Sequence, residues 1–205
     1  MARKKMKSAK SADGGALLKK KEISMPQVVE DFCSRASIDT PWIKRMTVCK
    51  YGKSYEGQWD RKTGLKHGKG TSMNPSGEMY VGRYEDGVRH GYGVMYFWNG
   101  DKYEGQWEKN KMDGFGVYTW KDGIVYRGEW KMNIRTGKAK MKYPNGNLYK
   151  GNFAEGYKHG GGTHYYADGS RFEGSWHYNK KHGKGVFISK EGIRTKQTWR
   201  NGRKV

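Results

Sequence analysis

Aromatic, polar and glycine positions follow a pattern that repeats every 23 residues over the C-terminal three-quarters of this chain. The clearest copy begins at Tyr103-Glu104-Gly105-Gln106-Trp107, contains Asp113-Gly114-Phe115-Gly116 and ends at Asp122-Gly123. A fixed period of this length indicates a repeat array, in which each copy is one supersecondary unit stacked on the next. The copies begin at Tyr55, Tyr80, Tyr103, Tyr126, Tyr149 and Phe172, and a decayed seventh copy begins at Thr195.

Each copy contains two glycine-marked turns, separated by runs of about five residues that are typical of short strands. The first turn lies at Lys109-Asn110 in the copy that begins at Tyr103. In each copy this turn is expected to end at a His-Gly pair or its equivalent, such as His90-Gly91 in the preceding copy. The second turn carries pairs such as Asn99-Gly100, which predict type I′ hairpins because both central residues need positive φ. Two strands per copy without a helical pattern predict an all-β fold, a single-layer, elongated antiparallel β-hairpin array.

The composition fits a thin sheet better than a globule with an interior core. Of the 205 residues, 34% are hydrophobic, 14% are aromatic and 31 are glycine. No second layer is evident, so the aromatic rings have to supply most of the packing. Glycines at fixed repeat positions, such as Gly105 and Gly116, would let a ring from the next strand lie flat on bare backbone.

The opener Tyr-Glu-Gly-x-Trp followed by His-Gly-x-Gly resembles the MORN-repeat family, and the match recurs in register over about residues 51–201. It is plainest at residues 55–59 with 67–70 and at residues 172–176 with 182–185. The copy at Tyr126 departs most, since Arg127 replaces Glu and Thr136-Gly137-Lys138-Ala139 replaces His-Gly-x-Gly. The resemblance implies a groove-shaped array without a common enzymatic activity. It also implies scaffolds and adaptors of cilia, cytoskeletal rings and membrane-apposed assemblies.

The second and fourth residues after His-Gly-x-Gly lie on one face of their strand, because strand side chains alternate. One interpretation is that these rings only pack against one another and replace a core. The other is that a single-layer sheet leaves them open as a groove for a helix or extended segment of a partner protein. The candidate groove residues are Met95, Phe97, Tyr118, Trp120, Met141, Tyr143, His164, Tyr166 and Phe187.

The chain divides into three segments. Residues 1–22 form a basic tail, residues 23–50 form an N-terminal cap or docking segment, and residues 51–205 form the repeat array. The tail is expected to be disordered when alone. It is either a solubilising tail or an electrostatic arm for an acidic tubulin surface, anionic lipid or nucleic acid. Its basic residues are Arg3, Lys4, Lys5, Lys7, Lys10, Lys19, Lys20 and Lys21.

The segment 23–50 begins with helix-start residues, Ser24 and Pro26, and ends in an apolar stretch that includes Trp42 and Val48. We expect a short helical or irregular cap over the open sheet edge, because repeat arrays need capped ends. A docking helix for a partner subunit is the alternative. Open sheet edges also allow a homo-oligomer.

No arrangement typical of catalysis, cofactor binding or metal binding stands out, so we predict no catalytic residue, no cofactor and no metal site. Equivalent residues of adjacent copies lie two strands, about 9.5 Å, apart, whereas zinc ligands lie about 2.0–2.3 Å from one ion. The recurring carboxylates, such as Glu104, are therefore expected to make cross-strand pairs. The recurring histidines, expected to be turn residues, are His67, His90, His159 and His182.

The two cysteines, Cys33 and Cys49, and the lack of a signal or transmembrane run predict an intracellular protein with reduced thiols. The leading hypothesis is a non-enzymatic scaffold or adaptor that binds partner proteins through the groove. Its resemblance to small stand-alone arrays implies a cytoskeletal or ciliary assembly, with the axoneme of a cilium or flagellum as its site. The alternative is a peripheral membrane linker tethered to anionic lipid by residues 1–22. Nucleic-acid binding ranks last, because a net charge of +21 permits it but no known motif supports it.

Overall fold

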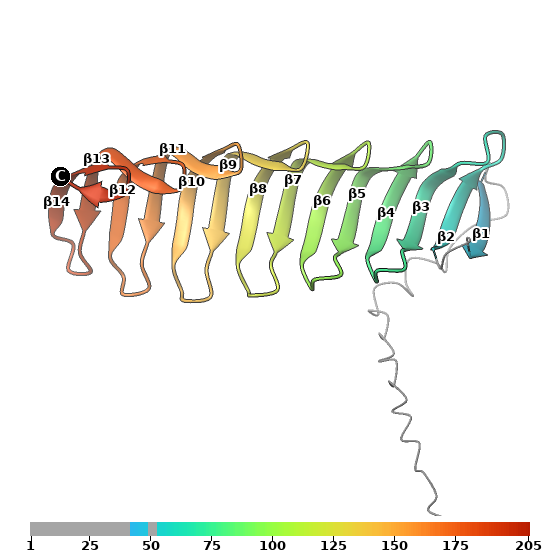
Figure 1. Cartoon of the computed structure of the whole chain (residues 1–205), viewed down its shortest axis with the longest axis horizontal. Helices are drawn as coiled ribbons and strands as arrows, with labels where there is room; N and C mark the ends of the chain where they lie inside the picture. Colours follow the sequence, from blue (N-terminus) through green and yellow to red (C-terminus); the bar gives the residue numbers. More distant parts are fainter. Residues whose placement is uncertain (1–41, 49–52) are drawn as a thin grey trace, which may run out of the picture. The chain divides into compact units, whose positions relative to one another are not determined.

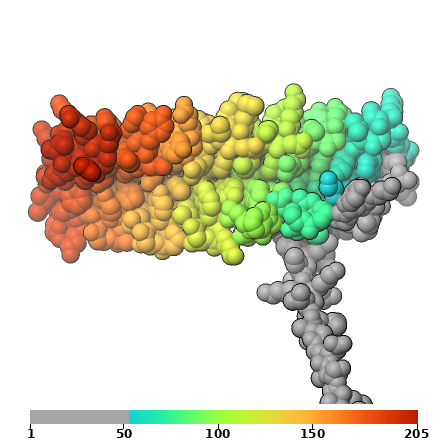
Figure 2. Space-filling view, in the orientation of Figure 1, coloured from blue at the N-terminus to red at the C-terminus, as the bar shows by residue number. Residues whose placement is uncertain are grey.

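The computed structural model describes residues 42–48 and 53–205, which form one antiparallel sheet of fifteen strands. Each strand pairs with its neighbours in sequence, so the sheet is an unbroken meander from β1 to β15 (Figure 1). Within the described ranges every regular element is a strand, which confirms the predicted all-β, single-layer repeat array. In a space-filling view the copies follow one another in chain order without a gap (Figure 2).

The strands are seven to nine residues long, except for the terminal β15, which has two. Their bounds are β1 Trp42–Val48, β2 Ser54–Asp60, β3 Lys66–Met73, β4 Met79–Glu85, β5 Val88–Tyr96, β6 Lys102–Glu108, β7 Lys111–Thr119, β8 Val125–Lys131, β9 Ile134–Lys142, β10 Leu148–Ala154, β11 Tyr157–Tyr165, β12 Arg171–His177, β13 Lys180–Ile188, β14 Arg194–Arg200 and β15 Arg203–Lys204. In the described part of the chain no helix is long and apolar enough to span a membrane.

The sheet starts earlier than the sequence predicted. Strand β1 pairs antiparallel with β2 along its whole length, from Trp42 opposite Asp60 to Val48 opposite Ser54. The apolar stretch at the end of the segment 23–50 therefore contributes a strand, where a helical or irregular cap was expected. The predicted helix itself, the tail 1–22 and both cysteines lie outside the described residues.

The type I′ geometry that was predicted for the second turn occurs instead at the first turn of every copy except the first, which has a longer loop. The first turn is the type I′ hairpin, because Lys109 and Asn110 both have positive φ, 46° and 69°. The second turn is wrongly predicted as type I′. At Asn99-Gly100 only the glycine has positive φ, 90°, and its N–H donates to the Phe97 carbonyl at 3.0 Å. The Asn99 side chain instead accepts from the Asp101 N–H at 3.0 Å, which holds a type I turn closed.

The sequence pattern predicted that the His-Gly pairs end the first turn. In the structure these pairs lie inside strands. His90 and Gly91 are the third and fourth residues of β5, and Gly91 lies opposite Trp107 on β6. The positive φ of Gly91, 64°, accommodates an irregularity in the pairing of β4 with β5. The strands are consequently longer than the five residues predicted.

Each first turn also hydrogen-bonds to the preceding copy, 21 residues back. The Asn110 N–H donates to the Arg89 carbonyl at 3.0 Å, and the Asn110 side chain accepts from the Arg89 N–H at 2.9 Å. Asn133 binds Met112 and Asn179 binds Lys158 in the same way. These bonds fix the start of one second strand against the next copy, in addition to the sheet ladder.

A continuous ladder of aromatic rings on one face of the sheet is the core. Consecutive rings meet edge to face with centroids 5.0 to 6.0 Å apart, the arrangement that aromatic pairs prefer. Six of the rings, the openers of the copies, are fully buried. The prediction that rings replace an interior core is confirmed. In order along the sheet the ladder is Trp59, Tyr55, Tyr84, Tyr80, Trp107, Tyr103, Trp130, Tyr126, Phe153, Tyr149, Trp176, Phe172 and Trp199.

Paired glycines give each opener ring its seat. Gly105 and Gly116 lie directly opposite each other on β6 and β7, and the Tyr103 ring lies across both. A Cβ at Gly116 would lie 2.5 Å from the Tyr103 Cε2 atom, too close for any side chain. We predicted that the ring over each glycine comes from a neighbouring strand. This holds for Gly116, but the ring over Gly105 comes from the same strand as the glycine. The Tyr103 hydroxyl then donates to the Gln106 carbonyl at 2.9 Å.

Candidate partner-binding groove

The predicted groove residues lie on the same face as the aromatic ladder, which we call the ladder face. Tyr118 on β7 lies opposite Tyr103 on β6 and Tyr126 on β8, so all three side chains project to one side. Met95 and Met141 occupy the equivalent place on β5 and β9, each between two opener tyrosines. The structure thus brings the predicted groove residues together in two rows beside the ladder.

The groove residues differ in exposure, and the two methionines belong to the core. Met95 and Met141 are buried at 7% and 8% exposure and belong to the core. The remaining groove residues are only partly buried and pack against the core with one side. An incomplete row of rings therefore stays open along the ladder face. These partly buried residues are Phe97, Tyr118, Trp120, Tyr143, His164, Tyr166 and Phe187.

The second turn that contains Asp101 orients part of the open row. Asp101 is buried at 8% exposure and accepts from the Tyr118 hydroxyl at 2.8 Å and from the Lys121 N–H at 2.9 Å. These two bonds join the second turns of adjacent copies. Tyr118 then packs on Phe97 and on Trp120, with ring centroids 5.7 and 4.5 Å away.

A row of cations, which the sequence analysis missed, lies over the ladder. The Lys158 Nζ lies 4.8 Å from the Tyr149 ring centre, 5.2 Å from Trp176 and 5.0 Å from the groove residue Tyr143. Lys181 lies over Phe172 and Trp199 in the same way, and Arg135 lies over Trp120 and Tyr126. The signal in the sequence was the 23-residue spacing of one position, occupied by Lys66, Arg89, Met112, Arg135, Lys158 and Lys181.

The cations are held in place by the inter-copy bonds of the first turns. Lys158 is fixed through its N–H to the Asn179 side chain at 2.9 Å and through its carbonyl to the Asn179 N–H at 3.1 Å. Arg135 is fixed by its own side chain, which donates to the Gly156 carbonyl at 2.7 Å. The cations are therefore built into the repeat and are not loose surface side chains.

Burial disfavours the charged form of the residues in this row and so lowers their pKa values. Burial lowers the pKa of Lys158 to about 8, and the charge of Arg135 adds to the effect. Burial, followed by the charges of Lys158 and Lys181, lowers the pKa of His164 to about 4. Burial also lowers the pKa of Arg89 and Arg135. Among the described residues no carboxylate forms an ion pair with Arg135, Lys158 or Lys181. Cation–π contacts compensate the desolvation only in part.

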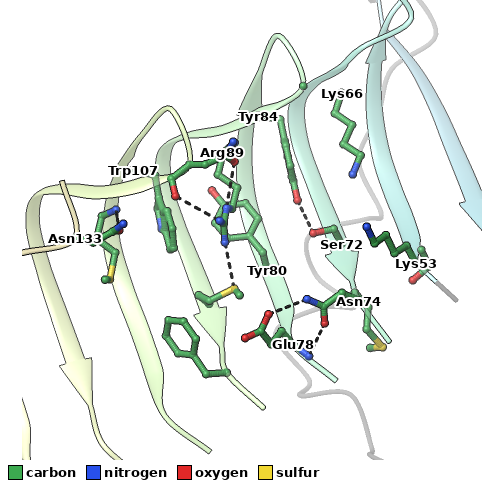
Figure 3. A pocket seen from close by; sticks show the side chains of 17 residues that line it. Lys53, Lys66, Ser72, Asn74, Glu78, Tyr80, Tyr84, Arg89, Trp107 and Asn133 are labelled. Carbon is green, nitrogen blue, oxygen red and sulfur yellow. Dashed lines mark hydrogen bonds between the residues drawn. The ribbon is translucent and has the colours of Figure 1, made fainter. Parts of the chain in front are cut away.

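At the first copy Ser72 and Asn74 stand in place of rings. A hollow of about 620 Å³ opens there, and its lining includes Ser72, Tyr84 and Arg89 (Figure 3). The Arg89 side chain contacts the Met95 sulfur at 3.5 Å and the Asn110 Oδ1 atom at 3.3 Å. A partner side chain could enter this hollow without displacing any ring.

The recurring histidines and carboxylates have local partners. His90 lies between Glu85 and Glu108, at 3.2 and 3.3 Å, in the first-turn region. Among the described residues there is no group of three ligands that could hold a metal ion. Glu104 pairs with Lys102 at 2.9 Å, on its own strand, so its closest cation is not the cross-strand partner that we expected. The tail residues Arg3 to Lys21 lie outside the described residues.

Comparison with known proteins identifies the repeat. The family model described as MORN repeat matches the chain six times, over most of its length. No curated protein matches the sequence. The matched residues are 55–79, 80–102, 103–125, 126–148, 149–171 and 172–194.

Three solved structures resemble the chain only remotely. The TCP domain of Drosophila melanogaster SAS-4 (dCPAP), in complex with a proline-rich motif of Ana2, is 13% identical, covers 76% of this chain and 90% of its own, and has a TM-score of 0.44. The G-box domain of the microcephaly protein CPAP is 12% identical, with 77% and 99% covered and a TM-score of 0.28. Streptogramin B lyase is 13% identical, with 79% and 57% covered and a TM-score of 0.18. These scores are too low to support an argument about function.

Proposed function

Because the chain belongs to the MORN-repeat family, a family of non-enzymatic interaction modules, we propose that it is a structural scaffold without catalytic activity. In this proposal the ladder-face groove holds a helix or an extended segment of a partner protein. The remaining family members' association with cilia and cytoskeletal rings, which the resemblance implies, supports a place in a cytoskeletal or ciliary assembly such as the axoneme.

One observation carries the proposal: a partly buried aromatic row lies beside cations that have no anionic partner among the described residues. Partly buried rings such as Trp120 and Tyr143 still offer apolar area and specific geometry to a ligand. The cations Arg135, Lys158 and Lys181 offer charge in a partly desolvated place, where an incoming carboxylate gains more than it would at an open surface. A partner with apolar and acidic residues would satisfy both features.

The repeat geometry limits how such a partner is spaced. Equivalent cations are two strands apart, about 9.5 Å. An extended chain rises about 3.3 Å per residue, so acidic residues would fall at about every third position. A helix rises 1.5 Å per residue, so acidic residues would fall about six or seven positions apart. The spacing of acids in a partner would therefore distinguish the two forms.

The alternative function, a peripheral membrane linker, depends on the basic tail 1–22. A polybasic segment is attracted to anionic lipid by about 1 kcal/mol per residue near the surface. That attraction is reversible and depends on salt, so deletion of the tail would release the protein from membranes. No described residue contributes to this alternative, and it remains a separate hypothesis.

The proposal is tested by extraction of cells that express the tagged full chain or a variant with Phe97→Ser, Trp120→Ser and Tyr143→Ser. The control carries Tyr92→Ser, which changes a ring of 56% exposure on the opposite face. Circular dichroism of the purified proteins establishes that both variants fold. We expect wild type and control to stay in the detergent-insoluble cytoskeleton and the groove variant to be released. Retention of the folded groove variant would refute the proposal.

A further inference from the structure

The face opposite the ladder, which we call the back face, carries an unusual concentration of positive charge at β8 to β10. Arg127 on β8, Lys140 on β9 and Lys150 on β10 lie directly opposite one another in the sheet register. All three are exposed, and Lys138 lies two residues before Lys140 on the same face. Like charges directly opposite each other destabilise a sheet. This arrangement therefore has a cost that packing does not explain.

The other copies avoid that arrangement at the same repeat position. Where Arg127 and Lys150 stand, the first, third and sixth copies have Glu56, Glu104 and Glu173. Among the six complete copies the change from acid to base is confined to two adjacent ones, so the cations of both copies and of the strand between them lie side by side. The chain thus replaces a dispersed pattern with one local patch.

A hollow of about 760 Å³ opens beside these cations, and its lining includes no carboxylate. Its floor is the bare backbone of Gly151, Gly161 and Gly162, and Phe115, half exposed at 51%, also lines it. The hollow exists because Gly161 has no side chain. The equivalent position holds Lys69, Tyr92, Phe115, Lys138 and Lys184 in the other copies.

Gly161 is not required by the backbone. Its φ is not in the left-handed region, and a Cβ placed on it would meet no atom within 4 Å. Most other strand glycines, in contrast, seat an opener ring of the ladder face. A glycine that the fold does not need, on the strand next to a basic patch, leaves space for something outside the chain.

Nearby carboxylates on the back face are already engaged. Glu104 pairs with Lys102 at 2.9 Å and accepts from the Tyr92 hydroxyl at 2.8 Å. Glu129 accepts from the backbone N–H of Lys138 at 3.2 Å. Glu173 pairs with Arg171 at 2.7 Å. None of these three residues forms an ion pair with Arg127, Lys140 or Lys150, which leaves the patch open to an external anion.

We infer that this hollow is a second binding site, for an acidic segment of a partner protein with one aromatic residue between its carboxylates. The aromatic ring lies on the glycine floor, as the opener rings lie on paired glycines on the ladder face. The carboxylates contact Arg127, Lys140 and Lys150, whose row spans two strand spacings, about 9.5 Å.

The chemistry of the site favours distributed carboxylates over a single phosphate. Compact phosphate sites converge on one point with Arg forks or with free backbone N–H groups. Here three of the four lining cations are lysines, they stand on separate points of the sheet, and the strand N–H groups are engaged in the ladder. A chain with several separate negative charges matches that spread.

The test is fluorescence anisotropy of the purified full chain with labelled synthetic peptides. The probe has the sequence Gly-Ser-Glu-Glu-Trp-Glu-Glu-Ser-Gly, and its comparison peptides carry Gln for Glu or Ala for Trp. Gly161→Tyr fills the hollow, and Lys184→Tyr adds the same ring at the equivalent position of the next copy as a control. Arg127→Glu breaks the charge row, and Lys196→Glu makes the same charge change in the seventh copy. Thermal melts establish that each variant folds.

We expect the acidic aromatic peptide to bind wild type, Lys184→Tyr and Lys196→Glu alike, and to bind Gly161→Tyr and Arg127→Glu at least 10-fold more weakly. Both comparison peptides should bind more weakly than the probe. Equal binding by all variants would overturn the inference, as would an absence of binding by wild type. Tighter binding of phosphatidylserine vesicles or single-stranded DNA, lost in Gly161→Tyr, would assign the hollow to another ligand class and also overturn it.

This inference is independent of the proposed groove function, and the two can fail separately. The folded triple variant Phe97→Ser, Trp120→Ser, Tyr143→Ser should bind the acidic aromatic peptide as wild type does, because those residues lie on the opposite face. Loss of peptide binding in the triple variant would place the peptide in the groove and refute the back-face site.

Discussion

The seating of the opener rings on paired glycines predicts that a single methyl group at Gly116 destabilises the sheet. In Gly116→Ala the new Cβ would lie 2.5 and 2.6 Å from the Tyr103 Cε2 and Cζ atoms. Ordinary carbon contacts are about 3.5–4.0 Å, so the ring has to move by about 1 Å. The ring has little room, because Tyr103 is fully buried and meets Trp107 and Trp130 edge to face at 5.2 and 5.5 Å.

The expected change in the free energy of unfolding is the sum of two destabilising effects and one stabilising effect. Overpacking of a tight core costs about 1–3 kcal/mol. Loosening of an edge-to-face aromatic pair costs about 0.5–1.5 kcal/mol more. Replacement of a glycine by alanine restricts the unfolded chain and returns about 0.4–1 kcal/mol. We therefore expect Gly116→Ala to lower the free energy of unfolding by about 2 kcal/mol.

Gly161→Ala is the matched control, since it is the same change in an equivalent strand where no atom lies within 4 Å of the new Cβ. There only the effect on the unfolded chain remains, and we expect a gain of about 0.4–1 kcal/mol. Urea denaturation followed by tryptophan fluorescence measures both variants. Similar changes in the two free energies of unfolding would refute the seating of rings on glycines.

Further predictions concern charge. Arg127→Glu should raise the free energy of unfolding by about 0.2–1 kcal/mol by removing like charges from opposite positions, and a loss of stability in urea denaturation would contradict this. Burial lowers the pKa of His164 to about 4. Below pH 6.5 the unfolded chain therefore binds a proton at His164 that the folded chain does not bind. The contribution of His164 to the free energy of unfolding is fully present above pH 6.5 and is lost as the pH falls toward 4. His164→Tyr should reduce that loss between pH 7 and 5 in denaturation experiments, and an unchanged loss would refute the assignment. The pKa of Lys158, lowered to about 8, should rise when an acidic partner segment enters the groove, and NMR titration that shows no rise would exclude a carboxylate contact.

Much of the fold was predictable because the repeat imposes it. The period of 23 residues, the alternation around each opener and the fixed glycines are local features, and they define strands, pairing order and the face of each ring. The groove residues followed from the same alternation. Met95 and Phe97 lie on the predicted face because side chains two residues apart in a strand share a side.

The errors have local physical causes. Asn99-Gly100 was assigned the wrong turn type because the Asn99 side chain can close a type I turn through the Asp101 N–H, an interaction that the pair Asn-Gly does not disclose. His90-Gly91 was taken for a turn end because a glycine with positive φ also fits a bulge inside a strand.

The cations of the groove were missed for a different reason. Lys158 is one of many basic residues in the sequence, and only the three-dimensional structure shows that it lies over Tyr149 and Trp176. Gly161 is likewise one of 31 glycines in the sequence. Only the structure shows that no atom would contact a Cβ at this position, unlike at the glycines that seat rings. Sequence patterns indicated the face of a residue but not which neighbours would fill the space around it.

The central claim, that the ladder-face groove holds a partner segment, is tested most directly by photocrosslinking in cells. Benzoylphenylalanine is placed at Tyr143 in the groove or at Tyr92 on the back face of the full chain, and mass spectrometry identifies the crosslinked residue. We predict that Tyr143 crosslinks to one protein segment whose acidic residues recur at the spacing of the groove cations. Crosslinking of Tyr143 to lipid alone, or no crosslink at Tyr143 when Tyr92 gives one, would contradict the account.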